Sequence, residues 1–210
     1  MVGETKIPLF PLELVLMPSM PLPLHIFEER YKLMTGECLE QKKEFGVVYQ
    51  KGSEMKKIGC TARIVQVLRR FDDGRLDIMT QGVNRFVIEN IYEDKPYLQA
   101  RVVYFDDERE EGDDNLIAEG IKLLEQLDVM TGKKRDYRAL SRMDHKTISF
   151  VISYNDVFSM EEKQSFLEMT STSERITKSM ESLKIMVKKE KLSREIKKII
   201  GGNGNLRRGI

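Results

Sequence analysis

Residues 7–31 read IPLFPLELVLMPSMPLPLHIFEERY, and this stretch decides the architecture of the chain. Proline has no backbone N–H and fixes φ, so neither a helix interior nor a central strand accommodates prolines at this density. The apolar residues between the prolines still require burial. We therefore expect an edge strand, polyproline-like backbone or turns here, lying as extended, irregular chain over a sheet core. The five prolines are Pro8, Pro11, Pro18, Pro21 and Pro23.

The chain that follows, from Phe45 to about Asp106, consists of short apolar runs separated by turn residues, a pattern typical of strands. A tight hairpin turn is expected at 72–74, where two aspartates precede a glycine. A meander of several short strands favours a small closed or nearly closed barrel. Alternation within 61–68 predicts that one mainly apolar set faces the core: Ala62, Ile64, Gln66 and Leu68. The predicted strands are 45–50, 60–71, 75–81, 85–92 and 97–105.

One helix is expected inside this strand-rich half, between Phe27 and Leu39. Its apolar residues recur at helical spacing, so they stack on one face while charged residues point away. We expect this helix to plug or flank the sheet. The predicted buried face comprises Phe27, Tyr31, Met34, Cys38 and Leu39.

Helical spacing replaces the strand pattern after the acidic run 106–114, which we interpret as a solvated linker because its like charges repel each other. Apolar stripes predict helices at 116–127 and 146–154. Two S-x-x-E capping boxes mark further helix starts. The second of these helices should run to about Ile200, where two glycines supply the stop. The residues concerned are Ser159 with Glu162, Ser171 with Glu174, and Gly201 with Gly202.

These patterns predict an α+β chain with two subdomains. Residues 1–110 should form the β-barrel with its one helix, residues 111–202 the helical bundle with a long C-terminal helix, and residues 203–210 a disordered tail. The net charge of +1 and the charged fraction of 33% indicate a well-solvated surface with no global attraction to nucleic acid or anionic lipid.

Cysteine usage and hydropathy bear on the compartment. Cys38 and Cys60 are the only cysteines and form no CxxC pair, so we expect neither a disulfide framework nor a zinc site, and a cytoplasmic location. The longest uncharged run, 14–27, is shorter than the ~18 residues needed to span a bilayer and contains three prolines. The opening MVGETK does not resemble a signal peptide. We expect no membrane association.

Several of these pieces, in order, resemble the amino-terminal, substrate-binding domain of the Lon ATP-dependent protease family. They are the opening at 7–31, FGVVYQ, IGCTARI, DGRLDIMTQGVNRFVI, PYLQARV, and the helical EEKQSFLEMTSTSERITKSMESL. The resemblance implies a PUA-like β-barrel followed by a helical bundle. It also implies recognition of unfolded or degron-like polypeptide, with unfolding and cleavage left to a separate ATPase or protease. The sequence contains no G-x-x-x-x-G-K-[ST] motif for a nucleotide.

Catalytic chemistry has little support in the sequence. His25 and His145 are the only histidines and lie in different halves, with no ligand spacing around either. No nucleophile elbow occurs, and a calcium loop centred on Gly112 would place Arg109 and Ala118 at ligand positions. We therefore expect that the protein has no enzymatic activity and binds neither a metal ion nor a cofactor. We expect His25 to hydrogen-bond backbone left unpaired by the neighbouring prolines.

The best candidate for binding polypeptide is the proline-flanked segment 14–24 with the histidine that follows it. Methionine side chains are flexible and suit adaptable apolar surfaces, and here they lie on stiff backbone. The alternative is that these methionines cover the barrel core. The candidate residues are Met17, Met20, Leu22 and His25.

A second function remains open for the basic segment 184–210, which has nine Lys or Arg and two Glu. This segment would make the chain an RNA-associated regulator. It lacks the interleaved aromatic residues on which bases stack, so nucleic acid is not the partner we expect.

Overall fold

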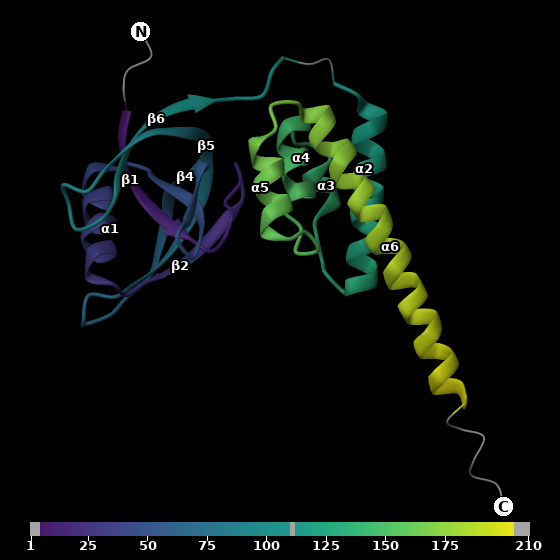
Figure 1. Ribbon diagram of the computed structural model, residues 1–210. Helices are drawn as coiled ribbons and strands as arrows, with labels where there is room; N and C mark the ends of the chain where they lie inside the picture. The colour runs from purple at the N-terminus through teal and green to yellow at the C-terminus, as the bar shows by residue number, and fades with distance from the viewer. Residues whose placement is uncertain (1–4, 110–111, 204–210) are drawn as a thin grey trace, which may run out of the picture. The chain divides into compact units, whose positions relative to one another are not determined.

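The computed structural model (Figure 1) describes residues 5–109 and 112–203, with side chains up to residue 196. The chain divides into two compact units. The sheet unit comprises Met1–Arg109 and Phe158–Ser171, and the helical unit comprises Glu110–Val157 and Thr172–Ile210. The sheet unit thus includes residues 158–171, which we had placed in the helical bundle.

The sheet unit contains six strands and helix α1 (Glu29–Gln41). Strand pairings run from β5 through β4, β3, β1 and β6 and return to β5, while β2 pairs with β5 alone among the described strands. The sheet is mixed, because β1 and β3 are parallel. An α+β fold is confirmed; the PUA-like assignment stays a prediction. The strands are β1 (Thr5–Leu12), β2 (Pro21–Ile26), β3 (Phe45–Lys51), β4 (Glu54–Arg70), β5 (Leu76–Tyr92) and β6 (Gln99–Phe105).

The proline-rich opening forms two regular strands, and β1 has neighbours on both sides (Figure 1). Residues 5–8 pair antiparallel with β6, and residues 9–12 pair parallel with β3. The expectation of irregular backbone or an edge position is wrong for β1. Prolines are tolerated there because each half of the strand pairs on one side, so a missing N–H can face the other side. The edge prediction holds for β2.

The predicted strands 75–81 and 85–92 are one continuous strand, β5. Gly82 lies in its middle and allows another segment to approach closely. A Cβ at this position would lie 2.1 Å from the carbonyl oxygen of Met17. The segment 17–20 is held there by two backbone bonds, from the Gly82 N–H to the Met20 carbonyl (2.9 Å) and from the Ser19 N–H to the Gly82 carbonyl (2.8 Å).

The core of the sheet unit is formed where β1, β3, β5 and β6 bury apolar side chains together. Phe86 is completely buried, and its ring lies against two glycines, where added Cβ atoms would come within 2.7 Å at Gly46 and 2.6 Å at Gly59. On α1 the predicted face is buried at Tyr31, Met34 and Cys38. Phe27 precedes the helix and is exposed, contrary to prediction.

Helix α5 (Met160–Glu168) belongs to the sheet unit because polar contacts attach it to the strands. Its predicted capping box, Ser159 with Glu162, is confirmed. The Gln164 amide donates to the Ile58 carbonyl at 3.1 Å, and the buried Arg85 guanidinium donates to the Leu167 carbonyl at 3.0 Å. Arg85 also pairs with Asp107, so the Asp107 side chain is buried, whereas its neighbours in the predicted solvated linker, 106 and 108–109, are exposed.

The helical unit packs the long α6 against α2 and α4 through the predicted apolar stripe Ile176, Met180, Leu183 and Val187. The helix passes through both glycines and ends at Asn203, so the predicted stop near Ile200 is wrong. Of the predicted disordered tail, residues 204–210 lie outside the described residues. The helices of this unit are α2 (Asp114–Thr131), α3 (Tyr137–Leu140), α4 (His145–Ser153) and α6 (Thr172–Asn203).

Candidate functional site

Three of the four predicted binding residues are buried. The exposed fraction is 0% for Met17, 8% for Met20 and 6% for Leu22. The two methionines are turned inward because the turn 17–20 is fastened onto Gly82 of β5. Leu22 lies on β2 opposite the buried Thr80, whose hydroxyl donates to its carbonyl at 2.8 Å. The expectation that these side chains reach solvent is wrong, and the alternative, that they cover the core, describes them.

His25 is exposed, and a side chain rather than backbone is its partner. Its Nδ1 lies 2.6 Å from Oδ1 of Asp77, the residue opposite it on β5. The imidazole is stacked beside the ring of Phe27, at 6.0 Å between centroids, and meets the ring of Phe71 edge-on at 5.8 Å. Instead of the predicted bond to unpaired backbone, His25 therefore makes a side-chain hydrogen bond to Asp77 and lies between two aromatic rings.

Exposed apolar side chains lie on β4 and just after β2, in the part of the sheet where both strands pair with residues 76–81 of β5. Phe27 is 58% exposed, Val65 52% and Leu68 49%. The register between β4 and β5 shifts between Ile64 and Gln66 and again between Val67 and Arg69, so Val65 and Leu68 are the extra residues of two β-bulges. We call His25, Phe27, Val65, Leu68 and Phe71 the tip surface.

The bulges explain why sequence alternation missed this surface. Strict alternation places Leu68 on the core side with Ala62, and Ala62 is indeed buried. Each bulge adds a residue to one strand and re-aims the side chains beyond it. Leu68 lies beyond the first bulge and is itself the extra residue of the second, and it consequently faces solvent.

Arginine side chains cover part of the tip surface. The guanidinium of Arg69 lies 4.3 Å and that of Arg75 4.8 Å from the centroid of Phe71. Arg75 is also held by Asp73 at 2.7 Å. The tip surface is therefore apolar at its centre and carries charges of both signs around it.

The main chain of β2 offers few hydrogen bonds to a further strand. The hydrogen bond from the Gly82 N–H to the Met20 carbonyl shows that the main-chain groups of Met20, and of every second residue after it, point towards β5. The main-chain groups of residues 21, 23 and 25 therefore point towards the open edge of the sheet. Two of those three are prolines, without an N–H. Recognition at this edge must rely on side chains rather than on β-augmentation.

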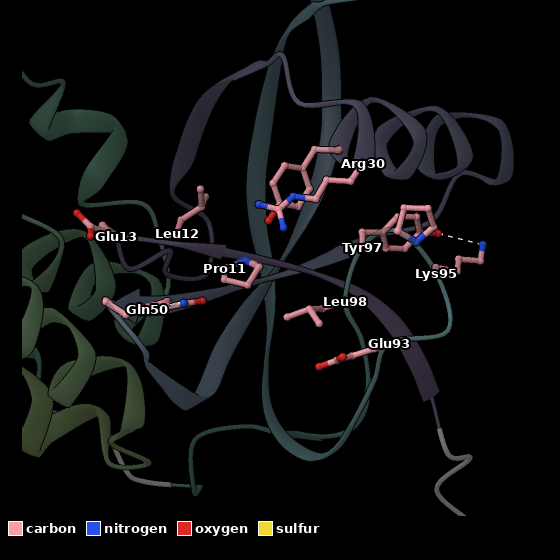
Figure 2. Close-up of a pocket in the computed structure, with 12 residues that line it drawn as sticks. Pro11, Leu12, Glu13, Arg30, Gln50, Glu93, Lys95, Tyr97 and Leu98 are labelled. Carbon is pink, nitrogen blue, oxygen red and sulfur yellow. Dashed lines mark hydrogen bonds between the residues drawn. The ribbon is translucent and has the colours of Figure 1, made fainter.

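A pocket with a volume of about 620 Å³ opens elsewhere on the sheet unit (Figure 2). Its walls come from the end of β1, the start of α1, the turn between β3 and β4, and the loop between β5 and β6. The Tyr31 ring in the wall is packed on Phe10, with centroids 4.1 Å apart. The residues that line the pocket include Pro11, Glu13, Arg30, Tyr31, Glu93, Lys95 and Leu98.

A hydrogen-bonded triad fixes one wall of the pocket. Lys95 Nζ lies 2.5 Å and the Tyr97 hydroxyl 2.6 Å from Oε2 of Glu37, and Lys95 also donates to Tyr97 at 3.0 Å. The bond from Lys95, followed by that from Tyr97, holds the pKa of Glu37 below its ordinary value. Burial in turn raises the pKa of Tyr97. The triad therefore attaches the β5–β6 loop to α1.

The candidate metal ligands lie apart from one another in the described residues. No group of three or more His, Cys, Asp or Glu side chains is gathered within them. His25 belongs to the sheet unit and His145 to the helical unit, where its Nε2 lies 3.0 Å from Asp114. Cys38 and Cys60 are buried free thiols, and burial raises the pKa of Cys38 to about 11.

No helix within residues 5–109 and 112–203 is both long enough and apolar enough to cross a bilayer.

A family model for the ATP-dependent protease La (LON) substrate-binding domain matches residues 6–185. Curated relatives include the Lon protease of Flavobacterium johnsoniae, 24% identical over 207 residues, which cover 91% of this chain and 25% of that protein. The Lon protease of Parabacteroides distasonis is 29% identical over 168 residues, covering 73% of this chain and 20% of that protein. This chain therefore spans about a quarter or less of the length of these relatives.

Solved structures agree at the level of the fold. The Lon N-terminal domain protein from Xanthomonas campestris superposes with a TM-score of 0.68 at 21% identity, covering 84% of this chain and 97% of that one. The N-terminal domain of a Mycobacterium avium complex Lon protease gives a TM-score of 0.65 at 16% identity, covering 86% and 98%. The likeness includes a mixed sheet and several helices with a long C-terminal one.

Proposed function

Since the chain belongs to the family of Lon substrate-binding domains, we propose that it is a non-enzymatic module that recognises unfolded or degron-like polypeptide. The observation that carries the proposal is the tip surface, where apolar side chains of the sheet unit are exposed beside aromatic rings. Exposed apolar groups of this kind are typical of interaction sites when they gather together.

Recognition at the tip surface would depend on side chains and tolerate many sequences. Apolar contact is non-directional, so a chain with any exposed large apolar residues satisfies it. Folded proteins bury those residues, which gives preference for unfolded chains. The prolines of β2 remove two of the three main-chain donors that this edge could offer to an added strand.

We further propose that a separate ATPase or protease acts on the bound polypeptide. The curated relatives are proteases of which this chain matches about a quarter or less. The chain would then supply selection, and its partner the energy and the cleavage. ATP should leave its affinity for polypeptide unchanged.

The test is to titrate the purified full chain with a fluorescently labelled, reduced and alkylated protein that cannot fold. A Phe27→Ser/Leu68→Ser variant should bind about tenfold or more weakly, because burying one large apolar side chain contributes roughly 1.5–3 kcal/mol. The matched control is Val129→Ser/Ile185→Ser, which alters side chains 72% and 67% exposed on the helical unit. This control should bind as the unaltered chain does.

Three results would reject the proposal: no binding at any ionic strength, an equal loss in the control variant, or tight binding of ATP. The RNA alternative has its own signature. Affinity for RNA that falls steeply with salt and disappears when residues 188–210 are removed would favour it instead.

A further inference from the structure

The pocket of Figure 2 differs from the tip surface in its charge. Two cations line it, and each already has a carboxylate partner outside the pocket lining: Arg30 lies 2.8 Å from Glu28, and Lys95 lies 2.5 Å from Glu37. Neither cation therefore contributes an unbalanced positive charge to the space.

Two further carboxylates line the pocket, Glu13 after β1 and Glu93 after β5 (Figure 2). Across the part of the chain that the structure describes, neither has an ion pair or a side-chain hydrogen bond. The nearby Lys51 is committed to Glu161 at 2.9 Å. With its cations balanced, the pocket is negative by two charges.

The remaining wall is suited to an aliphatic stem. Pro11, Tyr31 and Leu98 contribute carbon surface to the same pocket lining. A lysine or arginine side chain has both required parts, a methylene stem that packs on apolar surface and a cationic head for a carboxylate. The volume of about 620 Å³ lies within the range of roughly 300–1,000 Å³ found for ligand pockets.

We infer that this pocket binds a basic side chain, lysine or arginine, of the polypeptide that the module recognises. The inference rests on the proposed function, because a polypeptide held by the sheet unit is the source of that side chain. It adds a preference that the tip surface alone lacks: apolar segments carrying a basic residue should bind better than equally apolar segments with none or with an acidic one.

The test compares three fluorescently labelled, unstructured peptides of about ten residues that differ at one central position between leucines. The position holds lysine, ε-N-acetyl-lysine or glutamate. Acetylation keeps the stem and removes the charge, so the lysine peptide should bind the full chain roughly fivefold more tightly than the acetylated one at low salt. The gain is modest because ion pairs at exposed carboxylates are weak.

The residues are tested with Glu13→Gln/Glu93→Gln, which should abolish the preference for lysine, and with the reversal Glu13→Lys/Glu93→Lys, which should favour the glutamate peptide. The matched control, Glu40→Gln/Glu125→Gln, makes the same change in net charge at exposed glutamates that do not line the pocket. This control should keep the preference. Amide NMR shifts induced by the lysine peptide should include Leu12, Gln50 and Leu98 in the pocket wall.

Equal affinity for the lysine and acetyl-lysine peptides, or a preference that survives in Glu13→Gln/Glu93→Gln, would overturn the inference. If the unfolded protein still binds through Phe27 and Leu68 in that case, the proposed function stands without it. If the lysine peptide binds in the pocket while the tip variant binds the unfolded protein normally, the tip surface is rejected and the pocket is kept. Tighter binding of the glutamate peptide by the unaltered chain would assign the pocket to anionic segments and overturn the inference.

Discussion

Replacing Phe86 by alanine should destabilise the sheet unit by about 3–5 kcal/mol, which is the usual cost of removing a buried phenylalanine ring. The upper end of that range is expected here. The ring is completely buried, and it lies against Gly46 and Gly59, which have no side chains to move into the space. Because the hole collapses little on that side, the cavity contribution adds to the lost transfer free energy.

The measurement must report on one unit at a time, since a chain with two units need not unfold in a single step. The chain has no tryptophan, so bulk fluorescence cannot distinguish them. Urea denaturation followed by NMR amide signals of β5 and β6, separately from those of α2 and α6, gives the free energy of unfolding of the sheet unit. The control is Ile91→Ala on the same strand, where the side chain is 44% exposed.

We expect Ile91→Ala to cost less than about 1 kcal/mol. A loss below about 1 kcal/mol in Phe86→Ala, or equal losses in the two variants, would refute the placement of Phe86 at the centre of the core. Equal destabilisation of the α2 and α6 signals would instead show that the units unfold together.

Three further predictions concern the parts that fasten the sheet unit together. Gly82→Ala should cost roughly 1–3 kcal/mol of sheet-unit stability and shift the amide signals of residues 17–20. The control is Gly36→Ala in α1, which has open space around it and should stabilise the sheet unit by up to about 1 kcal/mol. Equal urea midpoints for the two variants would contradict this prediction. Arg85→Met removes the guanidinium that pairs with the buried Asp107 carboxylate and donates to the Leu167 carbonyl, and it should cost roughly 3–5 kcal/mol. Hydrogen exchange in residues 158–171 should become faster. Unchanged exchange there would show that Arg85 does not hold this segment. Because the pKa of Glu37 is lowered in the folded state, its ionised carboxylate stabilises the fold at pH values above 4.5, its ordinary pKa. That stability is lost as the pH falls through the lowered folded-state pKa, so Glu37→Gln should flatten the dependence of the urea midpoint on pH below about 4.5. An unchanged slope would count against the triad.

Sequence patterns predicted elements well where local spacing decides them. The burial of Tyr31, Met34 and Cys38 on α1 follows from helical periodicity, and the capping box at Ser159 follows from local hydrogen bonding. The family resemblance, which came from the order of the motifs, is confirmed by the match over residues 6–185. Each of these depends on residues close together in the chain.

The predictions that were wrong depend on contacts between distant segments. Nothing local to residues 17–20 indicates that Gly82 will hold them against the sheet and bury Met17. The exposure of Leu68 arises from bulges in the pairing of β4 with β5, and the assignment of residues 158–171 arises from bonds to Arg85 and Ile58. The pocket likewise joins four separate segments, so its charge balance has no signal in the sequence order.

The open edge of β2 has a consequence for the behaviour of the protein in concentrated solution. A protein with exposed apolar side chains can aggregate, with copies of itself or with unfolded chains, when the unpaired main chain of an edge strand hydrogen-bonds to another strand. With prolines at two of the three outward positions of β2, that pairing has almost no donors to begin from. The same residues that make the start of the chain hard to fold into an ordinary sheet thus help to keep its contacts reversible.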